Sequence, residues 1–311
     1  MLHRPRAVRR DLATEPRRPT RDERATSDPG RVEPRDLAPG LYIVATPIGN
    51  LRDITLRALD VLQRVDLVLC EDTRMGAKLL SAHGLRARLE RYDEHAAARV
   101  RPEILRRLGV GERIALTSDA GTPLVSDPGY RLVREAAEAG IPVFPIPGPS
   151  ALLAGLTVSG LPTDRFMFVG FLPTKSAARR RVLEDVASAS ATLIFFETGP
   201  RLAECLSDMA TALGRREAAV ARELTKLHET VVRGPLDLLA ADPRLQGPKG
   251  EIVIIVGPPA ATKIDIADVG PVLEEAVARL GLSAGAAEVA RATGLSRREL
   301  YAQALKRDPR G

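Results

Sequence analysis

The sequence has little of what many binding and catalytic sites are built from. Tryptophan is absent and aromatic residues make up 3% of the chain, so a platform on which single-stranded bases could stack is not expected. The two cysteines, Cys70 and Cys205, lack disulfide or metal-ligand spacing, which is typical of buried thiols in a reducing cytoplasm. The four histidines have no ligand-type partners near them, and we therefore expect no metal site.

Targeting and membrane segments are also missing from the pattern. No apolar stretch approaches the length of a membrane-spanning helix, and the basic start of the chain is followed by no apolar segment of the secretory type. We therefore expect a cytoplasmic protein with no membrane partner.

The basic charge is unevenly distributed. The net charge is +6, but residues 1–40 hold ten arginines against seven acidic residues, a net of +3 that accounts for half of the excess. Residues 1–39 show no apolar periodicity and are predicted to be a disordered tail. The charge of the remaining chain neither establishes nor excludes nucleic-acid binding.

Hydrophobic periodicity predicts two consecutive α/β domains and a small all-helical C-terminal segment. Apolar strands alternate with amphipathic helices over 40–160, which indicates a parallel sheet covered on both faces. The pattern breaks just before residue 161, where we place the boundary of a second α/β domain spanning 161–260. The segment 270–307 is helical throughout.

The expected elements follow from the same periodicity. The expected strands are 41–45, 65–70, 113–117 and 143–146 in the first domain, and 166–170, 192–196, 218–222, 229–233 and 251–256 in the second. The expected helices are 54–62, 73–82, 96–108, 130–139, 177–187 and 202–213.

Three strand ends of the first domain carry turns rich in glycine and proline, at 46–55, 118–129 and 147–150. Open α/β sheets bind ligands at the carboxyl ends of their strands. Asp119 has no helix to cap, so its carboxylate is predicted to accept hydrogen bonds from a ribose hydroxyl or an amino group of a ligand. Asp127 precedes a proline at an expected helix start and is predicted to be an N-cap, as is Asp53 for the helix after the first strand.

The C-terminal segment shows a helix, a glycine-containing turn and a serine-capped second helix over 286–300. This is the pattern of a helix-turn-helix, with Arg297 and Arg298 at the start of the second helix. Contact with RNA and packing on the rest of the protein are both compatible with it.

Five long motifs carry a resemblance to a known family. They are Val44–Ala58, Cys70–Arg74, Ser118–Gly129, Pro147–Ala151 and Phe168–Pro173. Together they resemble the bacterial ribosomal RNA small subunit methyltransferase I family, which belongs to the tetrapyrrole methylase superfamily, and the match covers about residues 41–306. The resemblance implies two α/β domains of the tetrapyrrole methylase type that hold S-adenosylmethionine between them, usually in a homodimer.

The implied activity is methylation of a ribose 2′-hydroxyl, on a cytidine in the decoding region of small-subunit (16S) ribosomal RNA. The partner would be that RNA or the ribosomal subunit containing it. Porphyrin-modifying relatives typically carry Gly-Pro-Gly-Asp-Pro after the first strand, where this chain has Ala45-Thr46-Pro47-Ile48-Gly49-Asn50. This departure argues against one alternative, a carbon methyltransferase acting on a tetrapyrrole precursor. A second alternative is a nucleic-acid-binding protein without catalytic activity.

The resemblance also implies site residues. Those expected to contact the cofactor are Pro47, Asp119, Ala120, Gly121, Val125, Ser126, Gly148, Ser150, Ala151 and Thr198. Candidates for activating the hydroxyl are Asp72, Glu197, Glu223, Lys226 and Lys249, each of which could instead form a solvated ion pair. Candidates for RNA contact are Arg52, Arg74, Arg297 and Arg298. The pattern does not single out one general base.

Overall fold

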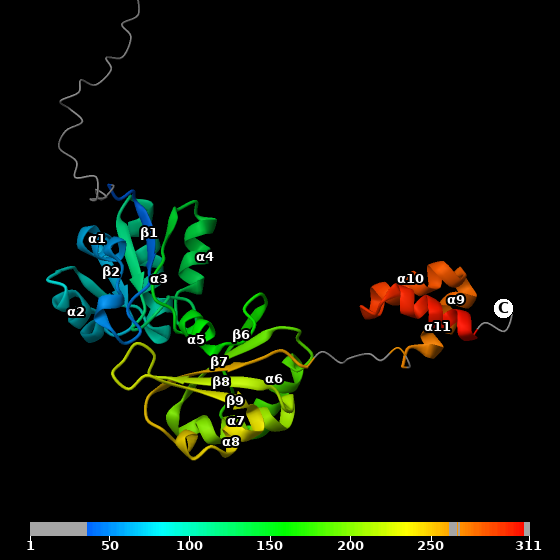
Figure 1. Ribbon diagram of the computed structural model, residues 1–311. Coiled ribbons are helices and arrows are strands. Elements are labelled where there is room, and N and C mark those ends of the chain that lie inside the picture. The colour runs from blue at the N-terminus through cyan, green and yellow to red at the C-terminus, as the bar shows by residue number, and fades with distance from the viewer. Residues whose placement is uncertain (1–35, 261–265, 267, 308–311) are drawn as a thin grey trace, which may run out of the picture. The chain divides into compact units, whose positions relative to one another are not determined.

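The computed structural model describes residues 36–260, 266 and 268–307 and divides into two units, with the boundary between Ser150 and Ala151 (Figure 1). Each unit is described by itself. None of the helices in the described ranges is long and apolar enough to cross a membrane.

The first unit is built on a five-stranded parallel sheet with the strand order β3-β2-β4-β1-β5. Its strands are β1 (Gly40–Val44), β2 (Leu67–Cys70), β3 (Leu89–Arg91), β4 (Arg113–Thr117) and β5 (Val143–Ile146). The predicted parallel sheet is confirmed. The short strand β3 was not expected, because it pairs only with β2 at the sheet edge and none of its residues is fully buried, so it leaves no apolar run.

Helices cover both faces of this sheet (Figure 1). They are α1 (Leu56–Arg64), α2 (Thr73–Ala82), α3 (Glu94–Gly109) and α4 (Tyr130–Glu138). Adjacent residues of β1 show the layering, since Tyr42 packs in the core with α1 and α2, whereas Leu41 packs in the core with α3 and α4. Helix α1 is capped by Thr55, whose Oγ1 accepts from the N–H of Ala58 over 3.1 Å, so the expectation that Asp53 caps this helix is wrong.

The first unit includes residues that precede Gly40. Leu37 packs against the core formed with α1 and α2, and the Tyr42 hydroxyl donates a hydrogen bond to the carbonyl of Ala38 over 2.6 Å. The segment predicted as a tail therefore includes residues that belong to the fold. The rest of that prediction, over 1–35, lies outside the described residues.

The second unit contains a mixed sheet with the order β6-β7-β10-β8-β9, in which β6 and β7 are parallel and the other pairs antiparallel. Its strands are β6 (Phe166–Phe171), β7 (Thr192–Thr198), β8 (Glu217–Arg222), β9 (Thr230–Pro235) and β10 (Glu251–Val256). Its helices before the C-terminal segment are α5 (Ala151–Ser159), α6 (Ser176–Val186), α7 (Leu202–Leu213) and α8 (Leu236–Ala241).

Helix α5 packs on the second sheet, although the sequence placed it in the first domain. Adjacent residues of β10 point to opposite faces of the sheet. Ile254 lies in the core with α6 and α7, whereas Val253 faces α5. A Cβ added at Gly155 would lie 2.8 Å from Cγ1 of Val253, which shows how closely this helix approaches the strand. The unit therefore begins at Ala151, earlier than the boundary expected after Gly160. The sequence of α5 shows no helical periodicity of apolar and polar residues because most of its residues are apolar.

The C-terminal segment consists of α9 (Gly270–Leu280), α10 (Leu282–Thr293) and α11 (Arg297–Arg307). These helices share a core of their own that includes Leu273, Val289 and Leu300. Gly294 ends α10 in the left-handed region with φ 73°, and Oγ of Ser296 accepts from the N–H of Glu299 over 3.4 Å at the start of α11. The predicted helix, glycine turn and serine cap are confirmed.

Candidate functional site

Three loops meet at the carboxyl ends of β1, β4 and β5. Thr46 and Gly121 exchange two backbone hydrogen bonds of 2.8 and 3.0 Å, which joins the loop after β1 to the loop after β4. The Thr46 hydroxyl adds a hydrogen bond of 3.0 Å to the carbonyl of Ser118. The Thr122 hydroxyl donates to the carbonyl of Pro149 over 3.1 Å, which brings in the loop after β5. The three glycine- and proline-rich turns therefore form one surface.

The loop after β4 holds backbone conformations that most residues avoid. Leu124 and Ser126 have φ values of 73° and 66°, and Gly121 between them and the strand has φ 82°. A non-glycine residue in this region costs of order 1 kcal/mol, and such costs concentrate at functional sites. The hydrogen bonds at Gly121 and Thr122 anchor the first part of this loop to its neighbours.

Asp119 lies at the exposed edge of this surface. Its Oδ1 accepts a hydrogen bond from the N–H of Asp72 over 3.2 Å, and its own N–H donates to Oε1 of Glu71 over 3.4 Å. The strand ends of β2 and β4 are thereby linked by two carboxylates. The exposed position leaves the Asp119 carboxylate accessible to a ligand.

Asp127 is not a helix cap, contrary to the sequence-based expectation. The N-cap of α4 is Gly129, with φ 131°, and no side chain caps this helix. A Cβ at Gly129 would lie 2.6 Å from Cδ2 of Leu116, so the chain turns closely over the sheet here and carries Asp127 inward. Burial, together with the nearby charge of Glu71, raises the pKa of Asp127 to about 7.

Asp72 caps α2 and forms an ion pair with Arg74. Its Oδ1 accepts from the N–H of Arg74 over 2.8 Å, and its Oδ2 lies 2.6 Å from Nη2 of the same residue. The side-chain hydrogen bond from Arg74 lowers the pKa of Asp72 to about 2. Asp72 is therefore a weak proton acceptor in this conformation, and its partner Arg74 is turned toward solvent, with 89% of its side chain exposed.

Glycines at two predicted cofactor positions lie in close contact with the loop after β1. A Cβ at Gly148 would lie 3.1 Å from Cβ of Ala45, and one at Gly121 would lie 3.4 Å from Cγ2 of Ile48. Pro47 and Ser150 belong to the same loops, whereas Arg52 is exposed in the short helix Leu51–Asp53 that follows the first loop. The absence of a side chain at the two glycines therefore lets these loops pack closely on one another.

In the second unit, Glu197 is fully buried. Its side chain has no exposed surface, its Oε1 accepts from the N–H of Thr198 over 2.8 Å, and its Oε2 lies 3.2 Å from Nη2 of Arg201. This arrangement is typical of a structural ion pair and gives a substrate no access to the carboxylate. Thr198 itself is exposed at the end of β7, and Ala151 begins α5.

Glu223 and Lys226 are partners of one another. Nζ of Lys226 donates to Glu223 over 2.9 Å and to Glu251 over 3.0 Å. The hydrogen bond from Lys226 lowers the pKa of Glu223, and the two carboxylates outweigh burial and raise the pKa of Lys226. Glu223 adopts φ 52° and is bracketed by Gly250, where a Cβ would lie 2.5 Å from its carboxylate.

Lys249 differs from the other candidates because it has no acidic partner among the residues that the structure describes. Its side chain is exposed just before β10, and its carbonyl accepts from Nη1 of Arg222 over 3.0 Å. It is therefore a cation available to an incoming anion.

The structure adds Glu71 and Arg91, which sequence reasoning did not select. Together with Asp72, Thr73 and Arg74 they line a pocket of about 220 Å³ beside Asp119. Glu71 was detectable, because it follows directly on the buried strand β2. Arg91 was not, since its position depends on the unexpected strand β3.

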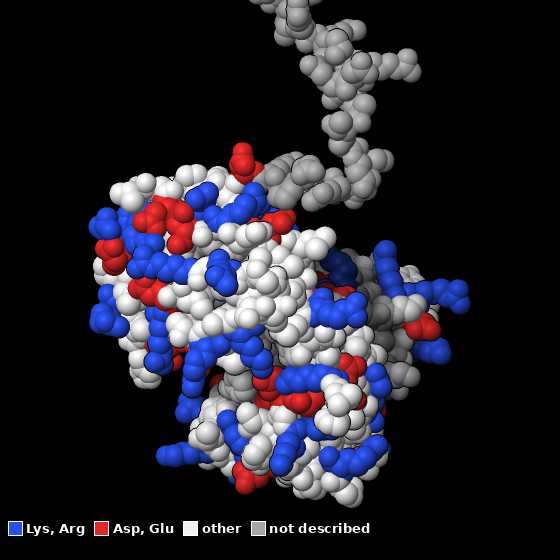
Figure 2. All heavy atoms as spheres, turned by 90° about the vertical axis from the view of Figure 1, so that its left-hand side faces the viewer, with Lys and Arg blue, Asp and Glu red and all other residues white. Residues whose placement is uncertain are grey.

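The arginines at the start of α11 are both exposed. Nη2 of Arg297 donates to Oγ of Ser283 over 3.0 Å, and Arg298 lies beside it on the first turn. Figure 2 shows that Lys and Arg side chains are intermixed with Asp and Glu over the face in view, so basic charge there forms no uniform surface.

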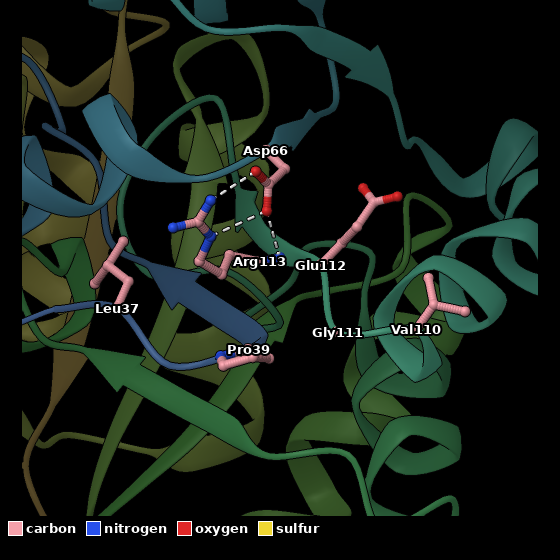
Figure 3. Close-up of a pocket in the computed structure, with 7 residues that line it drawn as sticks. All are labelled: Leu37, Pro39, Asp66, Val110, Gly111, Glu112 and Arg113. Atoms are coloured by element: carbon pink, nitrogen blue, oxygen red, sulfur yellow. Dashed lines mark hydrogen bonds and ion pairs between the residues drawn. The ribbon is translucent and has the colours of Figure 1, made fainter.

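A larger pocket lies at the opposite, amino-terminal ends of the strands (Figure 3). It has a volume of about 360 Å³ and is lined by Leu37, Pro39, Asp66, Val110, Gly111, Glu112 and Arg113. Asp66 accepts hydrogen bonds from the backbone N–H, Nε and Nη2 of Arg113 at 2.8, 3.0 and 2.8 Å. These bonds join the start of β4 to the residue before β2 and occupy the Asp66 carboxylate. The polar groups in this pocket therefore stabilise the fold.

No group of three or more residues suited to hold a metal occurs in the part of the chain that the structure describes.

Comparison with known proteins is consistent with this geometry. The family model described as Tetrapyrrole (Corrin/Porphyrin) Methylases matches residues 40–240, and that of the RsmI C-terminal HTH domain matches residues 264–308. Similar solved structures include the cobalt precorrin-4 methyltransferase CbiF and a diphthine synthase, with TM-scores of 0.53 and 0.56 and sequence identities of 18% and 17%. Both cover 70% of this chain, and 94% and 89% of their own, and at these identities the likeness concerns the fold.

Relatives of higher sequence identity include several proteins named ribosomal RNA small subunit methyltransferase I. The protein of Mesorhizobium japonicum is 52% identical over 88% of this chain and 93% of its own length. That of Erythrobacter litoralis is 54% identical over 87% and 96%, and that of Escherichia coli O157:H7 is 46% identical over 86% and 94%.

These findings identify the chain as a member of the tetrapyrrole methylase family, a class of methyltransferases that use S-adenosylmethionine as methyl donor. Within that class it belongs to the ribosomal RNA small subunit methyltransferase I family, as the motifs in its sequence predicted.

Proposed function

We propose that this protein transfers the methyl group of S-adenosylmethionine to the ribose 2′-hydroxyl of a cytidine in small-subunit (16S) ribosomal RNA. The observation that carries the proposal is the extent of the match: relatives named for this RNA are up to 54% identical and aligned over nearly their whole length. The helical segment typical of these relatives is also present.

The loops of the first unit fit the cofactor. Asp119 offers an exposed carboxylate to the ribose hydroxyls or the amino group, which are donors that S-adenosylmethionine carries. Gly148 is exposed as well, and the close packing of Gly121 and Gly148 on Ile48 and Ala45 holds the three loops together. We propose that the cofactor contacts these loops at Pro47, Asp119, Ala120, Gly121, Val125, Ser126, Gly148 and Ser150, with Ala151 and Thr198 contributed by the second unit.

The chemistry needs alignment and removal of one proton. S-adenosylmethionine, when bound, supplies a methyl group on a positively charged sulfur. The acceptor oxygen forms a bond to the methyl carbon as the carbon–sulfur bond breaks, and the hydroxyl proton leaves to a base or to water. Residues of the chain must therefore hold the RNA ribose in line and favour loss of that proton.

The candidates for proton removal differ in what their contacts leave free. Asp72 and Glu223 are each held by a basic neighbour that lowers the carboxyl pKa. Lys226 is occupied by two carboxylates. We propose that Lys249, exposed and without an acidic partner in the described part of the chain, is the cation that stabilises the developing negative charge on the acceptor oxygen.

We further propose that Arg52, Arg74, Arg297 and Arg298 contact the RNA. All four side chains are exposed, and the two on α11 occupy the position from which a helix-turn-helix contacts nucleic acid. The protein is proposed to act in the cytoplasm as a homodimer, which light scattering during size-exclusion chromatography would test.

Ribose-methylation mapping of small-subunit RNA tests the substrate, using cells with and without the gene. One cytidine should lose its 2′-O-methyl group in the deletion strain and regain it when the gene is restored. An unchanged map would overturn the substrate. Calorimetry with S-adenosylmethionine and its demethylated product tests the cofactor separately, since a non-catalytic nucleic-acid-binding protein would bind neither.

A further inference from the structure

The pocket beside Asp119 combines two kinds of group that recognise a nucleotide. It is lined by Glu71, Asp72, Thr73, Arg74 and Arg91 and has a volume of about 220 Å³. A guanidinium group can bind two phosphate oxygens at once through two parallel N–H donors, and a carboxylate accepts hydrogen bonds from sugar hydroxyls. We propose that this pocket receives one ribose-phosphate unit of the substrate RNA, with Arg74 and Arg91 on the phosphate and Glu71 on a ribose hydroxyl.

The proposal rests on the proposed function, because it concerns the acceptor of the same reaction. It also depends on position. The N–H of Asp72, in the pocket wall, donates to Asp119, and the N–H of Asp119 donates to Glu71, so the wall is hydrogen-bonded directly to a proposed cofactor residue. A nucleotide bound in this pocket would lie next to the methyl donor.

The two arginines are available to a phosphate. Each is paired with a carboxylate of its own segment, Arg74 with Asp72 and Arg91 with Asp93, but 89% and 67% of their side chains are exposed. Exposed ion pairs of this kind contribute roughly 0–1 kcal/mol, so exchange of the carboxylate for a phosphate costs little. The two arginines come from different strand ends, after β2 and in β3, and are brought to one pocket by the pairing of those strands.

Glu71 is available to a hydroxyl. It is half-buried, it accepts the N–H of Asp119 over 3.4 Å, and it has no basic partner among the described residues. Asp72, next to it, is fully engaged with Arg74. Burial raises the pKa of Glu71.

The test measures binding of the full chain to the small-subunit ribosomal RNA transcript, or to the assembled subunit if wild type methylates only that. The double variant Arg74→Ala/Arg91→Ala should bind at least about tenfold more weakly. The slope of log affinity against log salt is negative, and its magnitude should decrease by roughly 0.7–0.9 for the lost phosphate contact. Arg88→Ala is the matched control, since Arg88 is exposed in the segment just before β3 and does not line the pocket.

A second arm tests the hydroxyl contact with a fragment of the same sequence made as RNA and as DNA. Wild type should prefer RNA, and Glu71→Ala should reduce that preference, whereas the double arginine variant should weaken both. If inorganic phosphate binds the protein but displaces neither the RNA nor the DNA fragment, the pocket is a site for a free anion and the proposal is overturned. Calorimetry with S-adenosylmethionine checks that each variant is folded.

The outcomes separate this proposal from the proposed function. If wild type neither binds nor methylates the RNA, the proposed function fails. If wild type methylates it and the double arginine variant binds RNA as Arg88→Ala does, with the same salt slope, the pocket alone is overturned.

Discussion

The backbone N–H of Asp72 donates a hydrogen bond of 3.2 Å to the side chain of Asp119, forty-seven residues further along the chain. This contact links the end of β2 to the end of β4, which are adjacent in the sheet. It places the residue proposed to bind the cofactor against the wall of the pocket proposed to bind RNA. On these two proposals, the loop after β4 serves both the cofactor and the RNA.

Substitution of Asp119 by alanine should weaken cofactor binding without unfolding the protein. Loss of a charged hydrogen-bond acceptor should reduce the affinity for S-adenosylmethionine by roughly tenfold or more, while loss of the bond to Asp72 costs about 1 kcal/mol of stability. Isothermal titration calorimetry and thermal melting measure the two effects. Asp185→Ala, at an exposed position of α6, is the control. Affinity equal to wild type in a folded Asp119→Ala variant would remove this residue from the site.

Ser126→Gly should separate stability from binding. Ser126 has φ 66°, and glycine adopts this conformation without steric cost, so the free energy of unfolding should rise by about 1 kcal/mol. If the serine side chain contacts the cofactor as proposed, affinity should fall in the same variant. Denaturant unfolding and calorimetry would show both changes. A variant that binds as well as wild type would leave the strain in this loop as a purely structural feature.

Asp127→Asn should change how stability depends on pH. The pKa of Asp127 is raised from 3.8 to about 7 in the fold, so the folded protein holds a proton that the unfolded chain releases. The contribution of Asp127 to the free energy of unfolding is therefore greatest below about pH 4 and decreases as the pH rises toward 7. Asparagine is always neutral and removes this decrease, so its melting temperature should exceed that of wild type by about 3 °C or more at pH 8. The two proteins should converge near pH 4, and parallel pH profiles would contradict the expected burial of the carboxyl.

Glu197→Gln distinguishes a structural from a catalytic role. Glu197 is buried against Arg201, and removing its charge leaves that guanidinium poorly paired. We expect a loss of about 1–3 kcal/mol of stability, with affinity for S-adenosylmethionine unchanged in the folded fraction. An inactive variant with the melting temperature of wild type would instead return Glu197 to the candidates for catalysis.

The double variant Arg297→Ala/Arg298→Ala should weaken RNA binding and leave cofactor binding intact. Loss of phosphate contacts from the first turn of α11 should reduce the salt dependence of RNA affinity by roughly 0.7–0.9 per contact. Lys306→Ala, in the last turn of the same helix, is the control. Equal RNA affinity in the double variant and the control would favour the alternative, in which these helices serve packing alone.

The sequence by itself determined the features that depend on local periodicity and on turn chemistry. Strands such as Arg113–Thr117 and Glu251–Val256 are apolar runs bounded by turns, and the helix-turn-helix is marked by Gly294 and Ser296. The three pliable loops of the first unit were detectable because each follows an apolar strand and is rich in glycine and proline. Asp119 could be selected because it follows a strand and caps no helix.

The tertiary structure decided the rest, because burial and pairing depend on residues far apart in the chain. Asp127 has the local sequence of a helix cap, yet the turn at Gly129 carries it inward beside Glu71, where the pKa of its carboxyl is raised to about 7. Helix α5 looked like the end of the first domain, but its apolar surface is buried against β10. Only the pairing of β2 with β3 brings Arg91 to the pocket of Arg74, because no local pattern records which strands become neighbours.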